Sequence, residues 1–115
     1  MKNKLKISII TVTKNSDKFL QETIDSLSKQ THQNFEHIIV DGASTDKTLD
    51  IIKKNSSKIK KWISEPDHGL YYAMNKGIKL CSGDIIGILN SDDIFFPKAL
   101  STVNRYFLVN EIDFL

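Results

Sequence analysis

Short apolar runs alternate with amphipathic segments along the whole chain. Four runs rich in isoleucine, valine and threonine lie at residues 6–13, 35–40, 59–64 and 85–89. β-Branched residues favour extended backbone, so each run predicts a strand, and residues 112–115 predict the start of a fifth. The run 85–89 carries no polar side chain, which predicts a strand buried on both faces.

The segments between these runs carry apolar residues at helical spacing. The first helix is predicted from Leu20, Ile24 and Leu27, and Ser16 or Asp17 is its expected N-cap. Three later helices are predicted in the same way. The second carries Leu49, Ile51 and Ile52, and the third carries Leu70, Ala73, Met74, Gly77 and Ile78, all expected on one face. The fourth has Pro97 in its first turn and carries Ala99, Leu100, Val103 and Phe107. Strands that alternate with helices predict an α/β fold with right-handed βαβ units, and so a mostly parallel sheet with helices on both faces.

The composition is that of one globular domain. The chain has 115 residues, 40% of them hydrophobic and 26% charged, which is enough for a modest core. A net charge of +2 is too small to indicate nucleic-acid binding. Five lysines between residues 53 and 61 are interpreted as a solvated helix end and loop, with contact to phosphates or to an anionic membrane surface as the alternative.

Three features predict a cytoplasmic location. Residues 1–4 lead directly into the first strand without the pattern of a signal peptide, and no apolar run approaches membrane-spanning length. Cys81 is the only cysteine, which fits a reducing compartment. The inner face of the membrane is the second location that we consider.

Two adjacent carboxylates, Asp92 and Asp93, follow the run 85–89. They are expected at the carboxyl edge of the sheet, where open α/β sheets bind ligands. Adjacent like charges repel, and a divalent cation that prefers oxygen ligands, Mg²⁺ or Mn²⁺, would stabilise the pair. The alternative is a solvated turn in which one of the two caps the next helix, and the pair alone leaves both interpretations open.

A second group of polar residues is expected at the same edge. In a doubly wound sheet the first and fourth strands flank the point where the strand order reverses. Thr13, Lys14 and Asn15 should therefore lie beside residues 90–93 across one crevice, with Asp41 one strand away. A carboxylate such as Asp41 can accept a hydrogen bond from a base N–H or a ribose hydroxyl.

Some of these polar residues have a simpler structural interpretation. Asp41 and Asp46 could simply cap the helix that begins near Thr48, and for Asp46 we favour that role. The chain has neither the glycine-rich fingerprint of dinucleotide-binding domains nor a P-loop, which argues against both classes.

Four stretches, in this order, resemble the family 2 glycosyltransferases of the GT-A fold. They are SIITVTKN at residues 8–15, DGASTD at 41–46, SEPDHGLYYAMNKGI at 64–78 and NSDD at 90–93. The third is similar to the subgroup that builds bacterial surface polysaccharides. The resemblance covers essentially the whole chain and implies a Rossmann-like, nucleotide-sugar-binding sheet.

The resemblance implies a UDP- or GDP-sugar donor, Mg²⁺ or Mn²⁺, and inverting transfer to a saccharide or lipid-linked acceptor. By this resemblance Asp41 would hold the base, Asp92 the ribose or sugar, and Asp93 the metal ion. The remaining donor-binding residues that it implies are Thr13, Lys14, Asn15, Ser44 and Asn75.

The chain departs from the family pattern at three positions. Gly42 follows Asp41 where many relatives have a second acid, Lys14 stands where tyrosine is common, and Tyr72 replaces a frequent acid. These departures bear on how the base is recognised and on the choice of donor.

In this family the general base lies in the second half of the domain, so no catalytic residue is assigned here. We expect residues 1–115 to be the N-terminal, donor-binding portion of one domain, truncated, with apolar surface that an oligomer or a missing C-terminal half would cover. A non-catalytic nucleotide-sugar-binding module is the alternative function. A sugar nucleotidyltransferase would need a glycine-rich basic loop after the first strand, which residues 13–16 do not supply.

Overall fold

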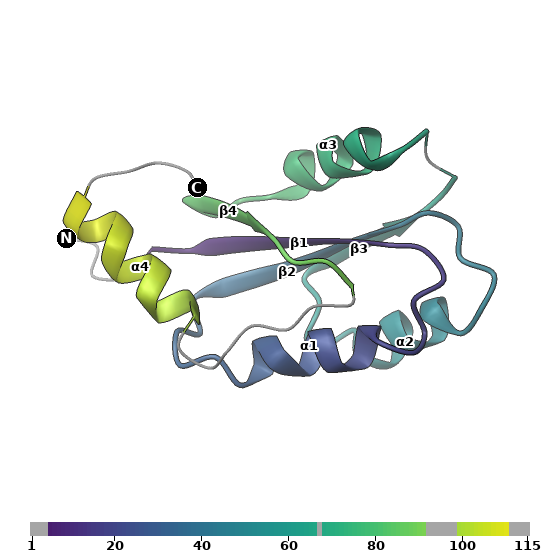
Figure 1. Cartoon of the computed structure of the whole chain (residues 1–115), viewed down its shortest axis with the longest axis horizontal. Helices are drawn as coiled ribbons and strands as arrows, with labels where there is room; N and C mark the ends of the chain where they lie inside the picture. Colours follow the sequence, from purple (N-terminus) through teal and green to yellow (C-terminus); the bar gives the residue numbers. More distant parts are fainter. Residues whose placement is uncertain (1–4, 67, 92–98, 111–115) are drawn as a thin grey trace.

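One four-stranded, all-parallel sheet organises the molecule (Figure 1). The computed structural model describes residues 5–66, 68–91 and 99–110. Its elements are β1 (Ile7–Thr13), α1 (Leu20–Ser28), β2 (Phe35–Asp41), α2 (Thr48–Lys54), β3 (Lys61–Ser64), α3 (Leu70–Leu80), β4 (Ile85–Ile88) and α4 (Ala99–Asn110). The strand order β3-β2-β1-β4 confirms the parallel α/β sheet predicted from the alternating pattern.

The strand register decides which residues meet at the carboxyl edge of the sheet. β1 pairs with β2 along its whole length, and the last pair of this ladder is Thr13 and Asp41. In the next ladder Asp41 is the partner of Ser64, the last residue of β3. Thr13, Asp41 and Ser64, the last residues of β1, β2 and β3, therefore lie side by side at the carboxyl edge of the sheet.

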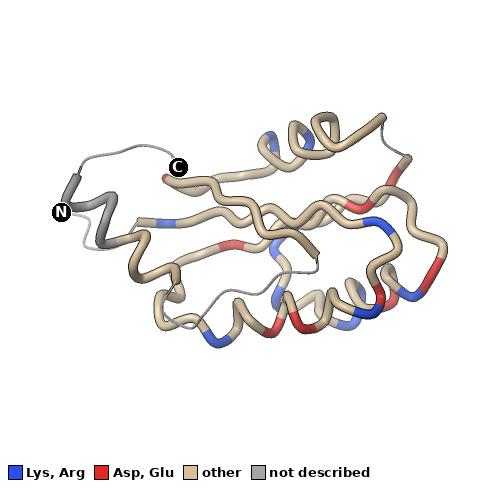
Figure 2. Tube along the Cα trace, in the orientation of Figure 1, with Lys and Arg blue, Asp and Glu red and all other residues tan. Residues whose placement is uncertain are grey.

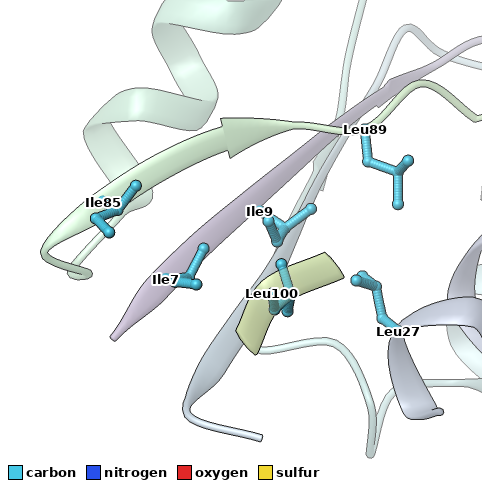
Figure 3. Close-up of a cluster of buried hydrophobic side chains, with 6 residues drawn as sticks. All are labelled: Ile7, Ile9, Leu27, Ile85, Leu89 and Leu100. Carbon is cyan, nitrogen blue, oxygen red and sulfur yellow. The ribbon is translucent and has the colours of Figure 1, made fainter. Parts of the chain in front are cut away.

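Helices cover the two faces of the sheet unequally (Figure 1). α1, α2 and α4 lie on one face, above two hydrophobic clusters. The first cluster, drawn in Figure 3, consists of Ile7, Ile9, Leu27, Ile85, Leu89 and Leu100. The second consists of Leu20, Ile24, Ile39, Ile52 and Ile59, with Trp62 packed against it. None of the described helices is long and apolar enough to cross a membrane.

Among the described helices, α3 alone lies on the opposite face, where it packs on β1 and β2. Ala73 and Gly77 are its buried residues. A Cβ placed on Gly77 would lie only 2.6 Å from Cγ2 of Ile10. The helix therefore packs so close to β1 that a larger residue than glycine at this position would clash with Ile10. The prediction that Leu70 and Ile78 share the buried face is wrong, because these side chains are 57% and 45% exposed.

The prediction that β4 is buried on both faces is also wrong. Ile85 is buried in the first cluster, whereas Ile88 is 41% exposed. Ile88 pairs with Ile10 and so faces the side of α3. Because α3 packs over β1 and β2, no described helix covers β4 on that side.

The predicted N-cap of α1 is wrong as well. The N-cap position is Phe19, and no side chain caps the helix. Instead the carbonyl oxygen of Ser16 accepts hydrogen bonds from the N–H groups of Phe19 and Leu20, at 3.1 and 3.0 Å. Ser16 Oγ instead bonds to Ser91 Oγ, and Asp17 Oδ2 accepts from the N–H of Lys47. Pro97 and the fifth strand predicted at residues 112–115 lie outside the described residues.

Candidate functional site

The loop after β1 lies against the segment that follows β4. Ser16 Oγ is 2.9 Å from Ser91 Oγ, and Thr23 Oγ1 donates to the carbonyl oxygen of Ser91 at 3.0 Å. The residues immediately before Asp92 and Asp93 are therefore held at the carboxyl edge of β1, as predicted from the switch point. Asp92 and Asp93 themselves lie outside the described residues.

Asp41 is fully buried at the end of β2 and accepts three hydrogen bonds. Its Oδ2 accepts from the N–H of Ser44 at 2.9 Å and from the hydroxyl of Ser64 at 2.7 Å, and its Oδ1 accepts from the hydroxyl of Ser44 at 2.5 Å. A buried carboxylate is tolerated only when such donors replace water. Asp41 thus orders the turn after β2 and ties it to the end of β3.

Asn15 joins the loop after β1 to this turn. Its N–H donates to Ser44 Oγ at 2.8 Å, and its Oδ1 accepts from the N–H groups of Thr45 and Asp46 at 2.8 and 3.3 Å. Its φ of +51° lies in the left-handed region, which asparagine tolerates better than most residues. Ser44 therefore sits between Asn15 and Asp41, accepting from one and donating to the other.

Thr13 supplies a buried hydroxyl without a partner at the same edge. Its side chain is 2% exposed, and its Oγ1 makes no hydrogen bond to the described residues. The backbone carbonyl of Thr13 accepts from the N–H of Gly42 at 2.9 Å, which holds the two strand ends together. Native proteins leave few buried polar atoms unpaired, so this hydroxyl marks a position where a bound molecule could supply a partner. Lys14, the next residue, is exposed.

Asp46 is not the N-cap of α2, which is Lys47, but its side chain does bond to the first residue of that helix. Its Oδ1 accepts from the N–H of Thr48 at 2.9 Å, and its Oδ2 accepts from the N–H of Asp17 at 3.3 Å. Desolvation acts to raise the pKa of Asp46, and these hydrogen bonds outweigh it, so the pKa lies below its ordinary value. Asp46 therefore stabilises the start of α2 and the adjoining loop.

The structure does not bring every predicted residue into this cluster. Asn75 is exposed on α3, on the face turned away from buried Ala73 and Gly77. It is therefore not gathered with Thr13 and Asp41 in the crevice. The described part of the chain contains no group of three or more His, Cys, Asp or Glu residues that could hold a metal ion.

Sequence reasoning missed one residue of this edge, Ser64, whose hydroxyl donates to the carboxylate of Asp41. Its position follows from the parallel register, because residues that end neighbouring strands meet at one edge. A comparison of predicted strand ends could have found it. Ser91 lies beside the loop after β1, as expected for residues 90–93, and its contact with Ser16 depends on the loop conformation.

Comparisons with known proteins show the family to which this chain belongs. The family model described as glycosyl transferase family 2 matches residues 8–114. An uncharacterized glycosyltransferase of Mycobacterium tuberculosis H37Rv is 39% identical over 90 residues, which cover 77% of this chain and 34% of that protein. A PGL/p-HBAD biosynthesis glycosyltransferase of Mycobacterium bovis BCG is 37% identical over 92 residues, which cover 77% of this chain and 36% of the relative.

Solved structures show the same fold. Staphylococcus aureus TarS 1-349 in complex with UDP-GlcNAc superposes with a TM-score of 0.85 at 29% identity, over 92% of this chain and 32% of TarS. The mannosyltransferase PcManGT from Pyrobaculum calidifontis, in complex with GDP-Man and Mn²⁺, superposes with a TM-score of 0.77 at 22% identity, over 90% of this chain and 32% of its own. The chain spans about a third of the length of these relatives. It has the α/β fold of the GT-A type and belongs to glycosyltransferase family 2.

Proposed function

We propose that this chain is the nucleotide-sugar-binding portion of a glycosyltransferase, which transfers a sugar from a UDP- or GDP-sugar to a saccharide or lipid-linked acceptor. The observation that carries the proposal is the cluster of Thr13, Asn15, Asp41 and Ser44 at the carboxyl edge, beside the segment that leads to Asp92. The description of TarS with UDP-GlcNAc supports a uridine nucleotide in particular.

In this proposal Asp41 and Thr13 bind the base. A carboxylate has roughly four acceptor positions, and three on Asp41 are used, so one remains for a base N–H. The unpaired hydroxyl of Thr13 lies one strand away and would give the base a second hydrogen bond. Asn15 and Ser44 would act by holding the two loops in place, and exposed Lys14 would approach the phosphates.

The proposed metal site uses Asp93, with Asp92 on the ribose or sugar. Mg²⁺ is commonly held by one or two carboxylates together with substrate phosphates, so the lack of a three-acid cluster among the described residues is compatible with this site. A bound Mg²⁺ or Mn²⁺ would stabilise the leaving nucleoside diphosphate as a Lewis acid. PcManGT, described with GDP-Man and Mn²⁺, supports a divalent ion on this fold.

Inverting transfer also needs a general base for the acceptor hydroxyl, and we assign that role to no residue of this chain. A non-catalytic nucleotide-sugar-binding module is the second candidate. In either case we propose a cytoplasmic location. For a lipid-linked acceptor this would be the inner face of the membrane, where the lysines of residues 53–61 could contact anionic headgroups.

Calorimetric titration of UDP and GDP, with and without Mn²⁺, tests the proposal. We expect one nucleotide to bind with an affinity that rises in the presence of Mn²⁺, and Asp93→Ala to remove the metal-dependent part. Asp50→Ala is the matched control, since it removes an exposed carboxylate of α2 instead of one in the segment after β4, and this variant should bind as the unmodified chain does. Well-folded protein that binds neither nucleotide would rule out the donor site.

A further inference from the structure

A cavity of about 300 Å³ opens at the amino end of β2, between α1 and the segment of residues 55–60 that leads from α2 to β3. We call it the His37 cavity and define it by Ile24, Leu27, Phe35, His37, Ser57 and Lys58. An adjoining cavity of about 260 Å³ shares the last four of these residues. His37 precedes Asp41 by four residues, about 13 Å along the strand, so this cavity is separate from the nucleotide cluster.

His37 places a buried nitrogen without a partner in this cavity. The residue is 1% exposed, and its Nδ1 makes no hydrogen bond to the described residues. Nε2 lies 2.8 Å from Thr11 Oγ1 on β1, and the two ring nitrogens lie on opposite sides of an imidazole. Nδ1 therefore points away from β1, toward the side of β2 where β3 lies. On that side the N–H of Lys60 donates to the carbonyl oxygen of His37 at 2.9 Å, which sets the segment 55–60 beside the ring.

The partner of Thr11 decides which ring nitrogen carries the proton. The hydroxyl of Thr11 is fully buried, and Nε2 of His37 is its partner among the described residues. If Nε2 donated, the hydroxyl proton of Thr11 would lack an acceptor, so we assign Thr11 as the donor and Nε2 as the acceptor. Burial lowers the pKa of His37 to about 4, so the ring is neutral at pH 7 and its one proton is on Nδ1. The cavity therefore contains a buried N–H donor.

Lysine side chains give the mouth of the cavity a positive charge. Lys58 Nζ lies 3.4 Å from Asp25 Oδ1 in an exposed ion pair, and an ammonium group has two further N–H donors. Lys60 lines the adjoining cavity, and Figure 2 shows these lysine positions on the segment between α2 and β3. The carboxylate of Glu36 is on the opposite face of the sheet, where it accepts from Ser8. The polar groups of the cavity thus favour a ligand that accepts hydrogen bonds and carries negative charge.

We propose that the His37 cavity binds a small monocarboxylate with a short apolar tail. The carboxylate accepts from Nδ1–H of His37 and from the ammonium group of Lys58, and the tail packs against Ile24, Leu27 and Phe35. An apolar lining with a few polar groups is typical of small-molecule sites. The volume of about 300 Å³ equals that of about ten water molecules at roughly 30 Å³ each, which suits an acid of a few carbons and excludes a nucleotide.

Titration of butyrate into protein with nitrogen-15-labelled histidine, followed by NMR at pH 7, tests the proposal. The ring signals of His37 are those that His37→Phe removes. We expect Nδ1 to be the protonated nitrogen in the free protein and to shift saturably at about millimolar butyrate. Butylamine has the same tail but no acceptor and should leave the signal in place. An Nε2-protonated ring, no saturable shift with butyrate, or an equal shift with butylamine would overturn the proposal.

Substitutions test the two groups that hold the carboxylate, with the backbone amide of Ser57 as the reporter. His37→Phe keeps a ring but removes the donor, and should weaken butyrate binding at least tenfold. Lys58→Met on the exposed rim should weaken it about threefold, as expected for a solvated ion pair. Lys53→Met is the matched control, because Lys53 is exposed on α2 and does not line the cavity. The two lysine variants decide the matter even if His37→Phe does not fold: unchanged affinity in Lys58→Met, or an equal loss in Lys53→Met, would contradict the proposed site.

Discussion

At the scale of single residues, neighbouring side chains on β2 face opposite sides of the sheet and meet different environments. Glu36 accepts hydrogen bonds from Ser8 Oγ, from the N–H and Oγ of Ser82, and from Lys6, at 2.7 to 3.3 Å. Burial acts to raise the pKa of Glu36, and these donors outweigh it and lower the pKa to about 2. His37 has one hydrogen bond, between Nε2 and Thr11 Oγ1 at 2.8 Å, and burial lowers its pKa to about 4.

Both shifts predict that acid destabilises the fold. His37 binds a proton near pH 6.5 when unfolded but only near pH 4 when folded, so the unfolded state gains stability as the pH falls through this window. The loss should approach about 3 kcal/mol at the acid end. Glu36 adds a further loss between its ordinary pKa and about pH 2, because its stabilised carboxylate must then be protonated.

Urea denaturation at intervals between pH 7 and pH 4 measures this effect. His37→Gln should flatten the dependence of the unfolding free energy on pH, since glutamine does not titrate. An equal slope in the variant and the unmodified chain would show that His37 is solvated or paired in solution.

Thr11 and Thr13 provide a matched pair on one strand and one face. Thr11 has a partner in His37 and Thr13 Oγ1 has none among the described residues, although both are buried. Thr11→Val should therefore cost about 1–3 kcal/mol of stability, because it leaves His37 unpaired. Thr13→Val should cost nothing or stabilise slightly, and should weaken nucleotide binding about fivefold if its hydroxyl contacts the base. Thermal melts and nucleotide titration separate the two variants, and a similar loss of stability in both would contradict this assignment.

At the scale of elements, the distance between α3 and β1 depends on Gly77. Gly77→Ala gains up to about 1 kcal/mol in helix propensity but forces a methyl group to within 2.6 Å of Ile10, so we expect a net loss of about 1–2 kcal/mol. Gly87→Ala is the control, since its new methyl group would make an ordinary contact of 3.4 Å with Ile9. Chemical denaturation measures both. A Gly77→Ala variant as stable as the unmodified chain would mean that α3 can move away from the sheet at little cost.

The elements themselves were largely predictable from local pattern. Runs such as residues 7–13 and 35–41 are β-branched and apolar, and strands of parallel sheets need little more than that. The burial of α3 was predicted less well, because Leu70 and Ile78 fit an apolar stripe but lie beside a strand that the helix does not cover. The N-cap of α1 was missed because the loop after β1 directs Ser16 and Asp17 toward Ser91 and Lys47.

At the scale of the whole molecule, two regions of the sheet differ in what they bury. The nucleotide cluster at the carboxyl ends of β1 and β2 depends on hydrogen bonds of buried polar groups. On α3 and β4, by contrast, the apolar side chains of Leu70, Ile78 and Ile88 are exposed.

The sequence by itself determined the alternation of strands and helices, the parallel sheet and the candidate acids, because these depend on local propensity and on topology rules that act along the chain. Only the tertiary structure decided that Asp41 is buried and bonded to Ser44 and Ser64, that Thr13 Oγ1 has no partner among the described residues, and that Asn75 is exposed. These features arise where residues far apart in sequence meet at one edge. Strand register and helix placement set such contacts, and no local pattern specifies either.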